Sequence, residues 1–231
     1  MPSRANKRRS AGAFAAVCVI GLLAATIGFA EVAVYGNHFR TRDDVSQLAS
    51  VGGKKCHHNW RKESETLFVV VERGPHACNI RPPVKSDGDQ PNDIWRARLK
   101  ITRDTPKALR DDAYVALEVR SGPDSDYQLR VFPKDDRWRL LRTPAGGGFP
   151  QNGTDHAIKG VNDFNELELR AIGDKIKALA NGHVLTDVTD GSPGEVSGRR
   201  LAAIIGVSKE TDREVFGVLD DLVLACRQSG C

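Results

Sequence analysis

Apolar and polar residues alternate along most of the chain after residue 65, which predicts antiparallel β-strands. The clearest case is residues 93–102, where Trp95, Ala97, Leu99 and Ile101 are separated by arginine or lysine. A period of two places one face of a strand in a core and the other in solvent. Further strands are predicted at residues 67–72, 114–120, 127–132, 137–142, 201–207 and 215–224. Only residues 106–112 and 209–214 favour a helix, and both windows are short.

Residues 165–190 carry the strongest architectural pattern in the chain. Three short alternating segments are separated by the pairs Gly173-Asp174 and Asn181-Gly182, which supply the positive φ angles that tight hairpin turns require. The apolar positions of the first two segments are Leu167, Leu169, Ala171, Ile176, Ala178 and Ala180. The segment is therefore predicted to be a β-meander of three strands.

Antiparallel strands at this spacing, without long helical segments between them, predict an all-β fold in which two sheets form a sandwich. Trp138 and Leu140 are expected in its core, together with Trp95. We expect one domain over residues 65–231. The irregular, polar residues 31–64 are expected to form a stem and an entry segment.

The N-terminal segment has the pattern of a membrane anchor. Arg4, Lys7, Arg8 and Arg9 precede residues 11–30, which contain no charge and no proline. Twenty helical residues at roughly 1.5 Å each span the ~30 Å core of a bilayer. The basic tail, residues 1–10, is expected in the cytoplasm and the domain after residue 30 outside the cell membrane. Cleavage after Gly28-Phe29-Ala30, with secretion, is the alternative.

The charge distribution argues against a nucleic-acid-binding protein. The chain has 34 Lys and Arg and 30 Asp and Glu, and four of the basic residues but none of the acidic ones lie within residues 1–30. The exported part therefore has 30 charges of each sign and is neutral. Nucleic-acid binding requires a basic surface, for which this composition gives no support.

Four cysteines follow the predicted anchor. In an oxidising compartment, an even number favours disulfides, and of the three pairings that four cysteines allow we favour Cys56 with Cys78 and Cys226 with Cys231. The alternative at the first pair is a zinc site, because His57, His58 and His76 lie beside its two thiols and could complete a tetrahedral set of ligands. The sequence predicts no other cofactor, apart from the calcium considered below.

The order of motifs in the second half of the chain resembles the concanavalin A-like (laminin-G-like) jelly-roll domains of bacterial envelope proteins. The motifs are Trp138-Arg139-Leu140-Leu141, Ala157-Ile158, Asn165-Glu166-Leu167-Glu168-Leu169, Gly173-Asp174-Lys175-Ile176, Asn181-Gly182 and Leu219-Asp220-Asp221-Leu222. The resemblance covers about residues 94–224 and rests on turns and core positions. It implies a jelly roll of a kind that often binds carbohydrate, sometimes hydrolyses it, and frequently serves in sensors or adhesins.

No catalytic motif accompanies this pattern. The Glu-x-Asp-x-x-Glu strand of glucanases with this fold is absent, as is a Gly-x-Ser-x-Gly nucleophile elbow. Glu166 and Glu168 come nearest to the alternating carboxylates that a retaining glycosidase needs ~5 Å apart. They lie opposite Leu167 and Leu169 on their strand, so we interpret them as a solvated face.

Candidate ligand residues are few. Asp124, Asp126, Asp135 and Asp136 lie near predicted turns, where carboxylates can hold calcium but more often make local hydrogen bonds. Trp60 is the one tryptophan that could contact a ligand at the surface, because Trp95 and Trp138 are expected in the core.

These observations predict a membrane-anchored binding or interaction domain outside the cell membrane, with carbohydrate or another envelope component as its ligand. Two alternatives remain open. One is a glycoside-acting hydrolase of the same fold that uses carboxylates from loops, and the other is a structural envelope subunit held by protein contacts.

Overall fold

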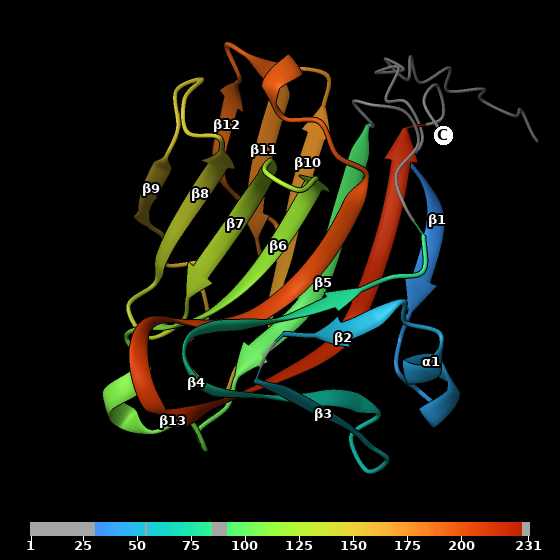
Figure 1. Cartoon of the computed structure of the whole chain (residues 1–231), viewed down its shortest axis with the longest axis vertical. Helices are drawn as coiled ribbons and strands as arrows, with labels where there is room; N and C mark the ends of the chain where they lie inside the picture. Colours follow the sequence, from blue (N-terminus) through green and yellow to red (C-terminus); the bar gives the residue numbers. More distant parts are fainter. Residues whose placement is uncertain (1–30, 54, 85–91, 228–231) are drawn as a thin grey trace, which may run out of the picture.

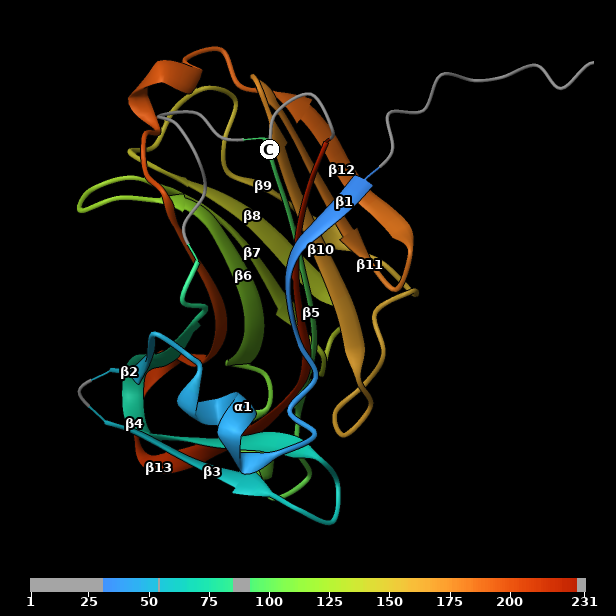
Figure 2. The same ribbon diagram turned by 90° about the vertical axis from the view of Figure 1, so that its right-hand side faces the viewer.

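The computed structural model describes residues 31–53, 55–84 and 92–227, which form a sandwich of two antiparallel layers (Figure 1, Figure 2). The strands are β1 (Glu31–Asn37), β2 (Ser50–Gly52), β3 (Cys56–Arg61), β4 (Thr66–Arg81), β5 (Asp93–Ile101), β6 (Ala113–Ser121), β7 (Asp126–Phe132), β8 (Arg137–Thr143), β9 (Gln151–Thr154), β10 (Asn165–Ile172), β11 (Lys175–Ala180), β12 (His183–Thr189) and β13 (Arg200–Arg227). Three short helical segments complete it: α1 (Arg42–Ser46), η1 (Lys107–Leu109) and η2 (Pro193–Glu195).

The long strand β13 belongs to both layers. Its first half pairs with β6 and with the second half of β4, and its second half pairs with β5, with the first half of β4 and with β1. The front sheet, facing the viewer in Figure 1, has the order β9-β8-β7-β6-β13-β4. The back sheet has the order β12-β11-β10-β5-β13, with β1 and the first half of β4 beside β13.

The apolar sides of the two sheets form the core. On β5, Trp95, Leu99 and Ile101 are fully buried, while the exposed Arg98 and the half-buried Lys100 point outward. Trp95 also joins the layers, because its indole Nε1 donates a hydrogen bond to the carbonyl of Ala202 in the first half of β13, at 3.0 Å. The two-sheet prediction is thus confirmed, as are the core positions of Trp95 and Trp138.

The meander predicted from residues 165–190 is confirmed as β10, β11 and β12. β10 pairs with β11, and β11 with β12, both antiparallel. Gly173, Asn181 and Gly182 in the two turns have φ values of 59°, 51° and 81°. These turns therefore use the left-handed backbone conformation that the sequence predicts.

Three expectations about the elements were wrong. Residues 31–64 are not an irregular stem, because they supply β1, which pairs with β13, and β2 and β3, which pair with β4. Residues 209–214 lie within β13 rather than in a helix, and the strand predicted at residues 67–72 is longer, because β4 continues through Gly74-Pro75 to Arg81. At this bend Gly74 faces Thr211, and an added Cβ would meet the carbonyl oxygen of Lys209, so glycine allows the two strands to pass closely.

Among the described residues, no helix is long and apolar enough to cross a membrane. The predicted cytoplasmic tail and anchor, residues 1–30, lie outside the described part of the chain.

A buried polar cluster closes one end of the sandwich. Arg142 of β8 and Asp190, which follows β12, are fully buried, and Arg142 Nε donates to Asp190 Oδ2 at 2.8 Å. The Tyr127 hydroxyl donates to the same carboxylate, and the backbone N–H of Ser192 donates to its other oxygen. Burial raises the pKa of Asp190, but these hydrogen bonds outweigh it and hold that pKa below its usual value. The cluster thereby links the front sheet to the back sheet.

We expect Asp190→Asn to lower the free energy of unfolding by about 2–3 kcal/mol, because it removes one of the two carboxylates that pair with the buried Arg142 guanidinium, the other being Glu195 at 2.8 Å. Because the pKa of Asp190 is lower in the folded state, its contribution is complete above the unfolded value of about 3.9 and is lost as the pH falls through the folded value. Urea unfolding at several pH values measures both effects.

The matched control is Asp187→Asn, which removes an exposed carboxylate lying 3.1 Å from Lys177. This change should cost less than about 1 kcal/mol. Equal losses in the two variants would contradict a structural function for the buried cluster.

Candidate functional site

The outer face of the front sheet is the candidate functional site, called the front face below. Its side chains come from alternate positions on β4, the first half of β13, and β6 to β9, and the register places them in rows across the sheet. They include Ala77, Asn79, Arg81, Ala202, Ile204, Gly206, Tyr114, Ala116, Glu118, Asp126, Gln128, Arg130, Phe132, Arg137, Arg139, Leu141, Asn152 and Thr154.

Local sequence explains why these residues point outward. On β6, Val115, Leu117 and Val119 are fully buried in the core, so Tyr114, Ala116 and Glu118 occupy the opposite side. Ala116 and Ile204 form a small apolar floor with Tyr114 and Phe132, separate from the main core.

Glu118 lies at the centre of a hydrogen-bonded row. The Gln128 amide donates to Glu118 Oε2 at 3.1 Å, and the Gln128 carbonyl accepts a hydrogen bond from Arg130 Nε. Arg81 lies on the other side, with its guanidinium 3.9 Å from Glu118 Oε1. The carboxylate is thus held between two arginines, one in direct contact and one reached through Gln128.

The Glu118 carboxyl has an altered acidity. Burial raises its pKa above the usual value, and the nearby Asp126 carboxylate raises it further. Hydrogen bonds from Ser121 and Gln128 and the charge of Arg81 act in the opposite direction without cancelling the rise. Glu118 therefore keeps its proton to a higher pH than an exposed glutamate does.

Arginine side chains cover the aromatic rings of the front face. Tyr114 and Phe132 are only 5% and 3% exposed. The Arg130 guanidinium lies 4.8 Å from the Tyr114 ring centroid, and those of Arg137 and Arg139 lie 4.8 and 5.9 Å from that of Phe132. These cation–π contacts hold the guanidinium groups at the surface. The face consequently presents cationic donors instead of bare rings.

This arrangement can bind a hydroxylated ligand that carries negative charge. Guanidinium groups donate forked hydrogen bonds to carboxylate, sulfate or phosphate oxygens. The Asn79 amide and the exposed Asn152 amide add neutral donors and acceptors at the two sides of the face.

The Cys56–Cys78 disulfide is confirmed, with 5.4 Å between the Cα atoms. It consumes both thiols that the zinc alternative requires, and the neighbouring His57 pairs with Glu72, Nε2 to Oε1, at 2.7 Å. The second predicted pair stays a prediction, because Cys231 lies outside the described residues.

The four aspartates proposed for calcium are not brought together. Asp124 and Asp126 lie at the start of β7, whereas Asp135 and Asp136 follow its end. The seven residues of this extended strand separate the two pairs by roughly 20 Å. Asp135 instead pairs with Arg137 at 3.0 Å. Within the described ranges, no three His, Cys, Asp or Glu side chains are placed to hold a metal ion.

Trp60 and the two glutamates of β10 have structural contacts. Trp60 is half-buried against the core, and its indole donates to the carbonyl of Phe39 at 2.7 Å. Glu166 is exposed on the outer face of the back sheet, as expected. Glu168 on the same face is ion-paired with Arg96 and Arg170 rather than solvated, which leaves no free pair of carboxylates there.

Sequence reasoning missed Glu118, Gln128 and Arg130. The available signal was the alternation itself, because each residue lies opposite a predicted core position on its strand. Their convergence could not be recognised without the register that pairs β6 with β7.

No protein-family model matches this sequence, and no curated protein matches it. Solved structures do share its architecture. A Bacillus subtilis protein of unknown function with a galectin-like fold has a TM-score of 0.60 at 11% identity, over 85% of this chain and 97% of its own.

Two other structures extend the likeness to carbohydrate-related proteins. The carbohydrate-binding module CBM66 of Bacillus subtilis has a TM-score of 0.52 at 14% identity, over 76% of this chain and 93% of its own. The β-glucanase of Bacillus licheniformis has a TM-score of 0.57 at 6% identity, over 82% of this chain and 96% of its own. The sandwich of β1 to β13 is therefore a concanavalin A-like jelly roll, the fold of these lectin-like and glucanase domains.

Proposed function

We propose that this chain is a membrane-anchored domain, exposed outside the cell membrane, that binds an acidic carbohydrate on its front face. The observation that carries the proposal is the group of four arginines on that face, Arg81, Arg130, Arg137 and Arg139. Arg81 and Arg137 pair with Glu118 and Asp135, whereas Arg130 and Arg139 form no ion pair with any described carboxylate. Support for carbohydrate as the ligand class comes from the shared fold with a carbohydrate-binding module and a glucanase. Binding of this kind depends on charge and weakens as salt screens it.

Arg139→Gln tests the charge requirement with little risk to folding, because Arg139 is exposed. Losing one charge-assisted hydrogen bond should weaken binding to an acidic polysaccharide, such as polygalacturonate or alginate, by about tenfold. Affinity electrophoresis of the full chain, with a neutral β-glucan run in parallel, measures the difference.

Arg213→Gln, an exposed arginine at the bend of β13, is the matched control and should bind like the unchanged protein. Equal binding of neutral and acidic polysaccharides, or unchanged binding by Arg139→Gln, would contradict the proposal.

Anchoring by residues 11–30 is tested separately. We expect the full chain to stay in the membrane pellet after alkaline carbonate extraction and to be digested by protease added outside intact cells. Recovery of a chain that begins near residue 31 in the medium would instead support cleavage and secretion.

A second candidate function is hydrolysis of a glycoside, favoured by the raised pKa of Glu118 beside Asp126. Glycosidases pair a carboxyl group that stays protonated with a second, ionised carboxylate. Here the two groups come from neighbouring strands, β6 and β7, rather than from one strand.

If the chain is a hydrolase, it should release reducing ends from an acidic polysaccharide, and Glu118→Gln should reduce that rate by at least about a hundredfold. Glu166→Gln, on the outer face of the other sheet, is the matched control and should keep full activity. If the unchanged protein binds the polysaccharide but releases no reducing ends, hydrolysis is contradicted and binding remains the proposed function.

A further inference from the structure

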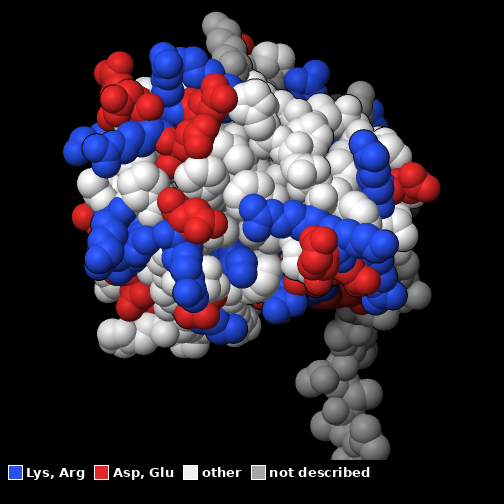
Figure 3. All heavy atoms as spheres, turned by 90° about the horizontal axis from the view of Figure 1, so that it is seen from below, with Lys and Arg blue, Asp and Glu red and all other residues white. Residues whose placement is uncertain are grey.

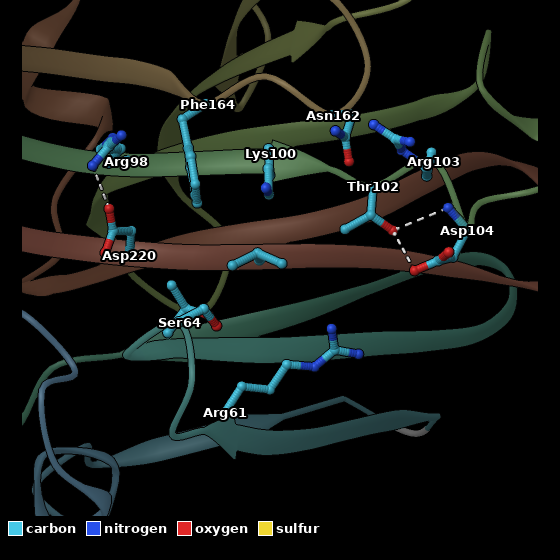
Figure 4. Close-up of a pocket in the computed structure, with 12 residues that line it drawn as sticks. Arg61, Ser64, Arg98, Lys100, Thr102, Arg103, Asp104, Asn162, Phe164 and Asp220 are labelled. Carbon is cyan, nitrogen blue, oxygen red and sulfur yellow. Dashed lines mark hydrogen bonds and ion pairs between the residues drawn. The ribbon is translucent and has the colours of Figure 1, made fainter.

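A pocket lies on the opposite side of the sandwich from the front face, between the outer face of the back sheet and the β3–β4 hairpin (Figure 4). Its volume of about 490 Å³ falls in the range of small-molecule sites. We call it the basic pocket. It is lined by Arg61, Ser64, Thr66, Arg98, Lys100, Thr102, Arg103, Asp104, Asn162, Phe164, Val218 and Asp220.

The pocket has more cations than carboxylates to neutralise them. Of its four basic side chains, Arg98 pairs with Asp220 at 2.5 Å. Arg61, Lys100 and Arg103 form no ion pair with any described carboxylate. They come from β3, from β5 and from the turn after β5, and the close-up shows them around one space.

Aromatic rings position two of these cations without neutralising them. The Lys100 ammonium lies 4.3 Å from the centroid of Phe164, and the Arg61 guanidinium lies 3.5 Å from that of Phe68. A cation–π contact fixes a charged group in place but leaves its N–H donors available to an anion.

The remaining lining suits hydroxyl groups. Thr66 and Thr102 are buried residues of the lining, with hydroxyls that can both donate and accept hydrogen bonds, and the Thr66 hydroxyl contacts that of Ser64 at 2.7 Å. Asp104 and the half-buried Asn162 lie at one side, and Thr102 Oγ1 already contacts Asp104 Oδ2 at 3.4 Å. Carboxylate, amide and hydroxyl groups of this kind are typical partners of sugar hydroxyls.

Figure 3 views the end of the molecule that lies at the bottom of Figure 1, where blue basic and red acidic side chains are interspersed over the surface. That end of the molecule therefore does not form a broad basic face of the kind that attracts polyanions without selectivity.

We propose that the basic pocket binds a small sugar bearing a phosphate or sulfate group, independently of the front face. Three separate cations from three segments suit a tetrahedral oxyanion, whose several oxygens accept from different directions. A planar carboxylate is matched by a single arginine fork. The oxyanion lies among Arg61, Lys100 and Arg103, and the sugar hydroxyls face Thr102, Asp104 and Asn162.

Isothermal titration calorimetry of the full chain tests the proposal with glucose 1-phosphate, glucose 6-sulfate, glucuronate, glucose and inorganic phosphate. We expect the phosphate or the sulfate ester to bind, and to bind at least about tenfold more tightly than glucuronate, glucose or phosphate alone. Comparing the two esters identifies which oxyanion is preferred.

Lys100→Gln and Arg61→Gln should each weaken binding of that ester by about tenfold or more, with melting temperatures near that of the unchanged protein. Lys175→Gln, on an exposed lysine at the start of β11, is the matched control and should leave binding unchanged. Arg139→Gln on the front face should also leave it unchanged, which separates this site from the proposed function.

Three results would overturn the proposal. The first is that neither ester binds at millimolar concentration. The second is that both Lys100→Gln and Arg61→Gln leave binding of the ester unchanged. The third is that glucuronate binds as tightly as the esters.

Discussion

The continuous pairing of β13 is the constraint on which the rest of the structure depends. This strand of 28 residues is hydrogen-bonded to β6 in the front sheet and to β5 in the back sheet, and β4 follows it through the same bend. The two sheets therefore cannot shift independently. The front face lies on one side of this shared strand pair and the basic pocket lies on the other, so the bend at Gly74 and Thr211 sets their relative orientation.

Ion pairing decides which charges of this neutral domain remain available to ligands. Glu31 and Glu168 take up Arg96 and Arg170 on the back sheet, with Arg96 to Glu31 at 2.5 Å and Arg170 to Glu31 at 3.1 Å. Asp190 takes up Arg142 inside the sandwich. Because these carboxylates are already ion-paired, they do not neutralise other cations such as Arg139 on the front face and Lys100 in the basic pocket. A net charge near zero thus coexists with two cationic surfaces, which composition alone could not reveal.

Features set by neighbouring residues could be predicted from the sequence, whereas features set by distant pairing could not. The meander followed from alternation and from Gly173 and Asn181, because a tight turn determines the pairing of the strands that it joins. The strands of residues 31–64 were missed because they pair with β4 and β13, far along the chain. Glu118 and Lys100 looked like ordinary outward positions. Only the register and the β3–β4 hairpin show what lies around them.

Aromatic content indicates sugar binding only where the rings are exposed. An exposed ring can stack on a sugar, so a chain with few tryptophans offers few platforms of that kind. Here the rings on the outer faces lie beneath cations instead, with Arg130 on Tyr114 and Lys100 on Phe164. A covered ring gives up direct stacking, but it holds a charged donor in a defined position at little entropic cost. The same arrangement on both surfaces shifts the expected ligands from neutral sugars towards those that carry negative charge.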